Sequence, residues 1–364
     1  MNQLDEAVVR YQKLLETGTF RDLGWAEALS ERMQAENLTQ AGRPICPFLR
    51  PNFITRRQYE TLVRAAEALF CSIDRVKQMA LEDPALLARM ELLPAEKMLA
   101  AVEPGYPFLT VTSLLDTHMN GSTLSFVEYN ADTPSGVVYG EALAELFLET
   151  PPMKEFRKRY KLEKLGGKKY LLSAILKAWK QFGGKTKPTI GILEFRQPFG
   201  SNEQGEASLL RDYFRKEGHD AEIVSPDQLE YRAGVLSKAG TPVDLIYRRI
   251  NVRDFLLKFD LSHPLVRAYR DGKVCMVNSF RSEIAQKKAI FALLTDETVT
   301  ASFPLAEKKA IRQYIPWTRM VVAGHASYHG ETVDLPEFIH KNREKLVLKP
   351  NDYGADQHSV HGWE

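Results

Sequence analysis

TIGILEF, the stretch Thr189–Phe195, decides the fold that we expect for this chain, because it is a continuous apolar run of strand length. A helical pattern follows over Glu206–Lys216 and is closed by Gly218. A second apolar stretch, AEIVSP (Ala221–Pro226), comes next. Strand, helix and strand at this spacing predict a parallel sheet.

The pattern continues on the carboxyl-terminal side with VDLIYRRI (Val243–Ile250) and KVCMVNS (Lys273–Ser279), which extends the expected sheet to a Rossmann-like domain. No glycine fingerprint follows the first strand, which excludes a nicotinamide-linked enzyme. Arg248 and Arg249 end the third strand, at the edge where open α/β sheets bind ligands. They alternate faces, so at most one of them should reach a substrate.

On the amino-terminal side, residues up to about 100 repeat apolar positions at helical spacing. Phe108–Leu115 and Thr123–Asn130 are predicted to be two strands joined by a turn at Asn120-Gly121. Residues 154–187 carry twelve Lys and Arg against two Glu, and we expect a basic helical connector there. A helical segment around Ser282–Leu294 and a strand KLVLKP (Lys345–Pro350) complete the chain.

A candidate metal site lies in LSFVEYNADTPSG (Leu124–Gly136). Glu128 and Asn130 are two apart on a strand and leave it on the same face, and Asp116 lies twelve residues before Glu128. An isolated Glu-x-Asn is usually a solvated strand face. Here the apolar neighbours predict partial burial, where acidic groups need a partner. Two carboxylates and an amide oxygen are the hard ligands that Mg²⁺ prefers, often with nucleotide phosphates.

Two lysines lie where a nucleotide's phosphates can be reached. Lys349 ends an apolar strand and is followed by a glycine-containing loop, and Lys288 is near the start of a helix. Either lysine alone is usually a solvated charge. Together with the oxygen cluster, they predict a triphosphate site.

Composition limits the class of protein. The 364 residues suffice for two or three domains, and the net charge of +2 favours neither a nucleic-acid nor a membrane partner. Three widely spaced cysteines fit a reducing compartment without disulfides or zinc. The first residues contain no apolar segment of the signal-peptide type, and no run approaches the ~18 residues of a membrane span. We expect a cytoplasmic protein, and the sequence does not indicate an oligomeric state.

EYNADTPSG, YRRI, NSFRSEIAQKKAIFALL and LVLKPNDYGADQHSVHGWE, in this order, resemble the circularly permuted ATP-grasp proteins. That group includes glutathionylspermidine synthase and eukaryotic-type glutathione synthetase. The resemblance runs from about Phe108 to the last residue. It implies an ATP-dependent ligase that phosphorylates a substrate carboxylate, after which an amine displaces phosphate from the acyl-phosphate.

The resemblance also assigns residues to the cofactors ATP and Mg²⁺. Asp116, Glu128 and Asn130 match the Mg²⁺ ligands, including the gap of twelve residues between the two acids. Lys288, in QKKAIFALL, matches the first nucleotide-binding lysine, and Lys349, in LVLKP, matches the second. Two cations and two lysines would neutralise the triphosphate and the charge that develops on transfer.

Other matches concern the phosphates and the substrate. Gly354 begins the expected glycine-rich loop over the phosphates. Arg249 matches an arginine that contacts the peptide substrate, which makes it the candidate catalytic residue, and Ser135 lies where a substrate-binding serine falls. Leu114 departs from the family, because glutathionylspermidine synthase has a transition-state arginine there. The family continues beyond the position of Glu364, so we expect the last segment to be an incomplete nucleotide-binding lobe.

We therefore predict an α/β (α+β) protein with a circularly permuted ATP-grasp fold, a Rossmann-like domain and an N-terminal helical region. Five segments are expected, namely a helical region (1–105), part of the ATP-grasp sheet with the metal ligands (106–150), the basic connector (151–187), the Rossmann-like domain (188–280) and the incomplete lobe (281–364). The predicted function is an ATP- and Mg²⁺-dependent carboxylate–amine ligase, with small-molecule peptide-like or polyamine-like substrates. The alternative is a catalytically degenerate ATP-grasp protein that binds a ligand or partner through the basic connector.

Overall fold

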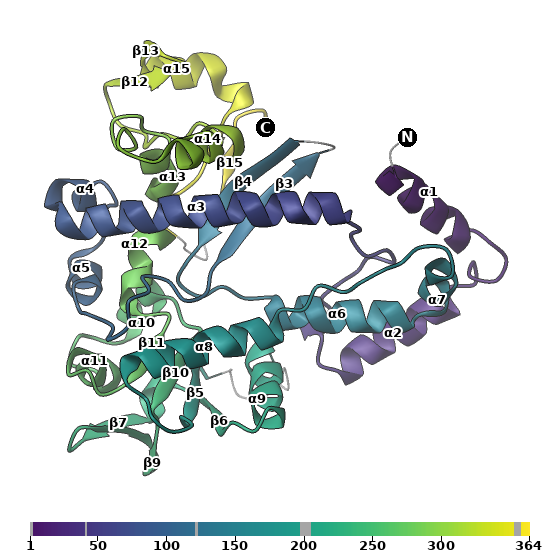
Figure 1. Cartoon of the computed structure of the whole chain (residues 1–364), viewed down its shortest axis with the longest axis horizontal. Helices are drawn as coiled ribbons and strands as arrows, with labels where there is room; N and C mark the ends of the chain where they lie inside the picture. The colour runs from purple at the N-terminus through teal and green to yellow at the C-terminus, as the bar shows by residue number, and fades with distance from the viewer. Residues whose placement is uncertain (1–2, 41, 121–122, 197–204, 353–357) are drawn as a thin grey trace. The chain divides into compact units, whose positions relative to one another are not determined.

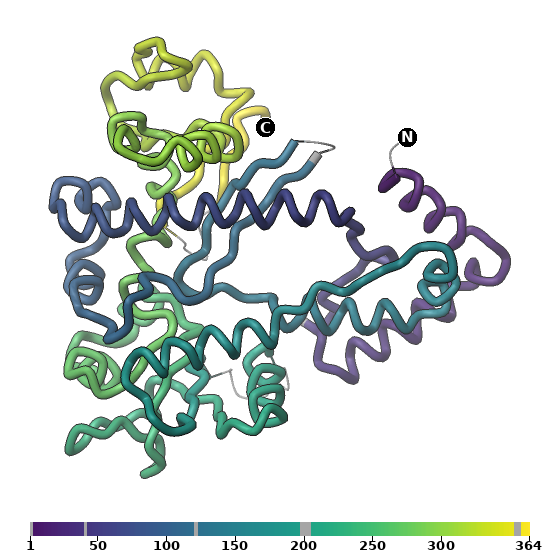
Figure 2. The backbone as a smooth tube through the Cα atoms, viewed as in Figure 1, coloured from purple at the N-terminus to yellow at the C-terminus, as the bar shows by residue number. Residues whose placement is uncertain are grey.

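A computed structural model describes residues 3–40, 42–120, 123–196, 205–352 and 358–364. The chain forms two compact units, unit 1 (Met1–Glu60, Ser135–Ile250 and Pro264–Val277) and unit 2 (Thr61–Pro134, Asn251–His263 and Asn278–Glu364). Each unit combines segments that are distant in sequence, as the mixed blue, green and yellow tube of unit 2 shows (Figure 2). The five segments expected from the sequence stay predictions.

The centre of unit 1 is a four-stranded parallel sheet, as predicted. Its strand order is β11-β10-β5-β6, with β5 at Ile190–Leu193, β6 at Ala221–Val224, β10 at Leu245–Arg248 and β11 at Cys275–Val277. Every residue of β5, β10 and β11 is buried. Gly191 is required in β5, because a Cβ there would lie 2.9 Å from Val243 Cγ1. Helices α8 (Lys168–Phe182) and α9 (Glu206–Lys216) pack beside the sheet (Figure 1).

Helices α1 (Gln3–Leu15), α2 (Gly24–Ala35), α6 (Val137–Glu149) and α7 (Pro151–Arg157) pack around apolar side chains of their own. Helix α11 (Pro264–Arg270) packs instead against the strands at Leu229–Arg232 and Val235–Lys238. Trp25, Leu29 and Phe147 are among the buried side chains that join α2 to α6. The short strands β1 (Thr39–Gln40) and β2 (Arg43–Pro44) pair antiparallel.

The segment expected to be a basic helical connector contains two helices, since α7 ends at Arg157 and α8 begins at Lys168. Gly167 precedes α8 in close contact with α6, since a Cβ there would lie 2.2 Å from Val137 Cγ2. Glu141 of α6 accepts hydrogen bonds from the N–H groups of Gly167 and Lys168 at 2.8 and 3.0 Å. This carboxylate therefore fixes where α8 begins.

A three-stranded antiparallel sheet lies between β6 and β10 in the chain and was not predicted. It contains β7 (Leu229–Arg232), β8 (Val235–Lys238) and β9 (Thr241–Pro242), after the short helix η1 (Pro226–Gln228). Ala233 and Gly234 join β7 to β8 with φ of 50° and 78°. Two consecutive positive φ values define the tight hairpin turn that matches strand twist, and alanine is an unusual residue in it.

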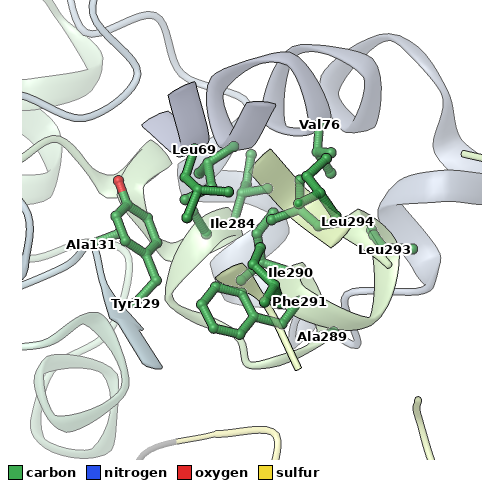
Figure 3. Packing of buried hydrophobic residues seen from close by; sticks show 14 of the residues in the cluster. Leu69, Val76, Tyr129, Ala131, Ile284, Ala289, Ile290, Phe291, Leu293 and Leu294 are labelled. Carbon is green, nitrogen blue, oxygen red and sulfur yellow. The ribbon is translucent and has the colours of Figure 1, made fainter. Parts of the chain in front are cut away.

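Unit 2 is built around the long helix α3 (Arg56–Glu82), which crosses the hairpin of β3 (Leu114–Asn120) and β4 (Thr123–Asn130) (Figure 1). Leu69, Ile73 and Val76 recur at helical spacing on α3 and are fully buried. They belong to the same apolar cluster as Phe126 of β4 and Leu294 of α13 (Ala289–Leu294), part of which is shown in Figure 3. This core supports one face of the hairpin.

The other elements of unit 2 are mostly short. They are α4 (Pro84–Ala88), α5 (Pro94–Ala100), α10 (Val252–Lys258), η2 (Phe280–Ser282), α12 (Glu283–Gln286), α14 (Leu305–Tyr314), the hairpin β12 (His325–Tyr328) and β13 (Glu331–Asp334), α15 (Leu335–Asn342), η3 (Arg343–Lys345), and the pair β14 (Val347–Leu348) and β15 (Val360–His361). Among the described residues, no helix is both long and apolar enough to span a bilayer.

Three predicted boundaries in unit 2 are wrong. The strand expected at Phe108–Leu115 is β3, which starts at Leu114, because Val111 and Thr112 donate their N–H groups to Asn278 Oδ1 instead of to a strand. The helix expected around Ser282–Leu294 is interrupted between α12 and α13. The strand expected at Lys345–Pro350 retains only the two residues of β14.

Candidate functional site

A β-bulge aims the predicted metal ligands away from the core. Glu128 pairs with Asp116 and Phe126 with Thr117, so Val127 is the extra residue of β4. Without the bulge, Glu128 would share the inward face of Phe126, because side chains alternate along a strand. After the bulge, the residue that faces the core is Tyr129, which is buried, and Glu128 lies on the opposite face of the strand.

Asp116, Glu128 and Asn130 lie together on the hairpin. Asp116 is directly opposite Glu128, and Asn130 Nδ2 donates a hydrogen bond to Asp116 Oδ2 at 3.2 Å. Burial raises the pKa of Asp116 above its ordinary value, and the charge of Glu128 adds to the rise. Two carboxylates that disfavour each other's charge create a place where a cation is favoured.

Both predicted lysines reach the same carboxylate. Lys349 Nζ lies 3.4 Å from Glu128 Oε2 and donates a hydrogen bond to the carbonyl oxygen of Val127, the bulge residue, at 3.0 Å. Lys288 Nζ lies 3.6 Å from Glu128 Oε1. Lysines from two distant segments therefore converge on one glutamate, with a second carboxylate opposite.

The donor set fits Mg²⁺. No group of three or more His, Cys, Asp or Glu side chains within the described ranges is placed to hold a metal ion. Mg²⁺, however, is usually held by only one or two carboxylates together with water and substrate phosphates. Asp116 and Glu128 supply those carboxylates, and a flip of the Asn130 amide would bring its oxygen to the same side.

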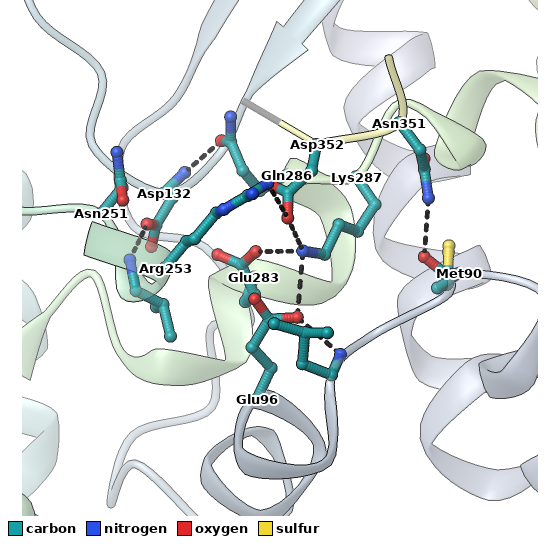
Figure 4. Close-up of polar contacts among 12 residues, drawn as sticks. Met90, Glu96, Asp132, Asn251, Arg253, Glu283, Gln286, Lys287, Asn351 and Asp352 are labelled. Atoms are coloured by element: carbon teal, nitrogen blue, oxygen red, sulfur yellow. Dashed lines mark hydrogen bonds and ion pairs between the residues drawn. The ribbon is translucent and has the colours of Figure 1, made fainter. Parts of the chain in front are cut away.

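A buried cluster of charges surrounds Lys287 (Figure 4). Its Nζ lies 3.0 Å from Glu96 Oε2, 3.0 Å from Glu283 Oε1 and 2.8 Å from Asp352 Oδ2. Burial, with a further contribution from the charge of Asp132, raises the pKa of Glu283 well above its ordinary value. Burial alone would lower the pKa of Lys287. The charge of Glu283 and the hydrogen bonds to Asp352 and Glu96 have a larger effect, so the pKa of Lys287 is raised.

The raised pKa of Glu283 predicts a specific pH dependence of stability. The folded protein keeps this proton to a higher pH than the unfolded chain, so its contribution to the free energy of unfolding falls as pH rises above the ordinary value of 4.5. Glu283→Gln removes the titration and keeps an oxygen for Lys287. In urea unfolding between pH 5 and 9, the variant should gain stability over the wild type as pH rises. Parallel pH profiles would contradict the assignment.

The loop that follows the predicted metal ligands is fixed by side chains of a later segment. Gln286 Oε1 accepts the N–H groups of Ala131 and Asp132, both at 2.9 Å. Asn278 Nδ2 donates to the carbonyl oxygen of Ala131 at 2.7 Å, and Ser282 Oγ donates to Asp132 Oδ1 at 2.8 Å. These bonds hold the end of β4 and with it the position of Asn130.

Arg249 belongs to a different cluster, in unit 1, at the carboxyl end of the parallel sheet. Its NH2 lies 3.0 Å from Glu206 Oε2, and its Nε lies 3.8 Å from Glu194 Oε1. Glu206, the first residue of α9, also accepts the N–H groups of Gly136 and Val138 at 2.9 and 3.1 Å. A single buried carboxylate thus joins the start of α6 to the end of β10.

Burial shapes the electrostatics of this cluster. The side chain of Arg249 is 10% exposed and that of Glu206 is 2% exposed. Burial raises the pKa of Glu194, although the positive charge of Arg249 acts in the opposite direction. Arg248 is buried, and its NH1 donates to the carbonyl oxygen of Ile250 at 2.7 Å. Of the two arginines, Arg249 alone retains a partly exposed side chain.

The structure thus groups five predicted residues in unit 2, namely Asp116, Glu128, Asn130, Lys288 and Lys349. Ser135 belongs to unit 1 and is exposed, and Gly354 lies outside the described residues. Sequence reasoning missed Glu206, although an acid directly after Gly205 at a helix start is a recognisable signal. It also missed Lys287, because nothing in the sequence distinguishes this lysine from the adjacent Lys288.

Comparison with known proteins supports the fold only at a coarse level. A scan against protein-family models gives no match, and a search of curated proteins gives none. Among solved structures, a glutathione synthetase-like effector from Globodera pallida, in its apo form, matches with a TM-score of 0.52. The match covers 83% of this chain and 67% of that one at 12% sequence identity. The chain is therefore a mixed α/β protein with a glutathione synthetase-like structural neighbour.

Proposed function

We propose that this chain is an ATP- and Mg²⁺-dependent carboxylate–amine ligase of the circularly permuted ATP-grasp type, similar to glutathionylspermidine synthase. The observation that carries the proposal is the convergence of Lys288 and Lys349 on Glu128, opposite Asp116. A cluster of two carboxylates and two lysines matches the charges of a metal–triphosphate complex. The fold similarity to a glutathione synthetase-like protein agrees with it.

The roles of the residues follow from their charges. Lys288 and Lys349 would leave Glu128 to bind the phosphates, while Asp116, Glu128 and Asn130 would hold Mg²⁺. Bound Mg²⁺ would neutralise charge on the phosphate oxygens. A carboxylate of a peptide-like substrate attacks the γ-phosphorus and ADP leaves. An amine, polyamine-like in this proposal, then attacks the acyl carbon, loses a proton and expels phosphate.

Calorimetric titration of the whole chain with a non-hydrolysable ATP analogue, with and without Mg²⁺, tests the proposal. We expect Mg²⁺-dependent binding that weakens about tenfold or more in Lys349→Ala, because a charged hydrogen bond to phosphate is lost. Lys345→Ala, which removes an exposed lysine four residues earlier, is the matched control and should bind as the wild type does.

Absence of analogue binding by the wild-type chain would sink the ligase proposal. It would favour the second candidate, a degenerate ATP-grasp protein that binds a ligand or partner. The basic segment is the surface for that candidate, since Lys158, Lys161 and Tyr170 are strongly exposed there.

A further inference from the structure

The segment that carries Lys349 has little apolar core of its own. It follows β14, a strand of two residues whose side chains, Val347 and Leu348, are 42% and 54% exposed. The partner strand β15 also has two residues. A segment with so few buried contacts opens easily unless polar contacts hold it.

Asn351 provides the first set of polar contacts. Its carbonyl oxygen accepts the N–H of Lys288 at 3.0 Å, and its Oδ1 accepts the N–H of Ala289 at 2.8 Å. Its Nδ2 donates to the carbonyl oxygen of Met90 at 3.1 Å (Figure 4). Asn351 therefore occupies the interruption between α12 and α13, beside the backbone of the other phosphate-directed lysine.

Asp352 provides the second set. Its Oδ2 accepts from Lys287 Nζ at 2.8 Å and lies 3.1 Å from Arg253 NH1. The Lys287 side chain is 1% exposed and is held from two further directions by Glu96 of α5 and Glu283 of α12. Asp352, at 20% side-chain exposure, is thus tied to a buried charge that the core of the unit keeps in place.

We propose that Lys287 is a positioning residue that, through Asp352 and together with Asn351, holds the Lys349 segment beside Lys288 so that both ammonium groups face one triphosphate. This role rests on the ligase function proposed above. Consecutive lysines then have separate tasks, since Lys287 points into the buried cluster and Lys288 towards Glu128. Holding two charges in place before the ligand arrives lowers the entropy cost of binding.

The test is Asp352→Asn in the whole chain. Lys287 keeps Glu96 and Glu283, so the variant should fold with a thermal midpoint close to that of the wild type. We expect Mg²⁺-dependent binding of the ATP analogue to weaken about tenfold, and the amides of Lys288 and Ala289 to exchange faster with deuterium. Glu344→Gln removes an exposed negative charge from the neighbouring η3 and should change neither quantity.

A double-mutant cycle separates positioning from a general structural role. If Asp352 acts through Lys349, Asp352→Asn should weaken analogue binding much less in a Lys349→Ala background than in the wild type. Equal effects in both backgrounds, or unchanged affinity and exchange in Asp352→Asn, would overturn the positioning role alone. No analogue binding by the wild-type chain would overturn the proposed ligase function and this role with it, whatever the exchange data show.

Discussion

Glu128→Ala should abolish the Mg²⁺ dependence of nucleotide binding while the protein stays folded. Glu128 is the residue on which both lysines converge, and its partner across the ladder is Asp116. Removing it leaves one carboxylate for the metal, and we expect at least a hundredfold loss of affinity for the Mg²⁺-bound ATP analogue, or about 2.7 kcal/mol. Calorimetry with and without Mg²⁺ measures this directly.

The same variant should retain weak, Mg²⁺-independent binding, because Lys288 and Lys349 lose their carboxylate partner and become more available to phosphate. The protein should still unfold cooperatively, since the bulge directs Glu128 away from the apolar core. Glu331→Ala on the exposed β13 is the control for loss of an acidic side chain. If Glu128→Ala unfolds instead, the carboxylate has a structural role and the metal assignment is wrong.

The fold was predictable where buried elements consist of continuous apolar residues. The strands β5, β10 and β11 are buried throughout and are read as apolar runs. The antiparallel strands β7 and β8 have mixed burial, and Ala233 replaces the glycine or asparagine that usually marks such a turn. Local pattern therefore revealed the parallel sheet and missed the antiparallel one.

The candidate site was predictable only where residue type and position suffice. Glu128 and Asn130 are two residues apart, so the sequence places both side chains on one face of the strand. Strict alternation would put Leu124 and Phe126 on that same face, and both of them are buried in the core. The bulge resolves this conflict, because the buried residues are Leu124 and Phe126 before it and Tyr129 after it. Lys287 had no comparable signal, because its burial depends on Glu96 and Asp352, which are far away in sequence.

Arg249→Met should destabilise unit 1 by about 3–5 kcal/mol, because it leaves Glu206 buried without its cationic partner. The backbone N–H groups of Gly136 and Val138 remain as donors to Glu206, but they do not neutralise its charge. Glu194, whose pKa burial already raises, would lose the same partner. Chemical denaturation, followed with a probe for the unfolding of unit 1, measures the loss.

The double variant Arg249→Met/Glu206→Gln distinguishes the charge from the packing. Glutamine keeps an oxygen for the N–H groups at the start of α6 and carries no charge, so the double variant should recover most of the lost stability. Arg232→Met, at a strongly exposed arginine of β7, should change the free energy of unfolding by about 0.5 kcal/mol or less. A wild-type unfolding midpoint for Arg249→Met alone would mean that Arg249 is not held by Glu206 in solution. The arginine would then be free to meet a substrate carboxylate without first breaking a buried ion pair.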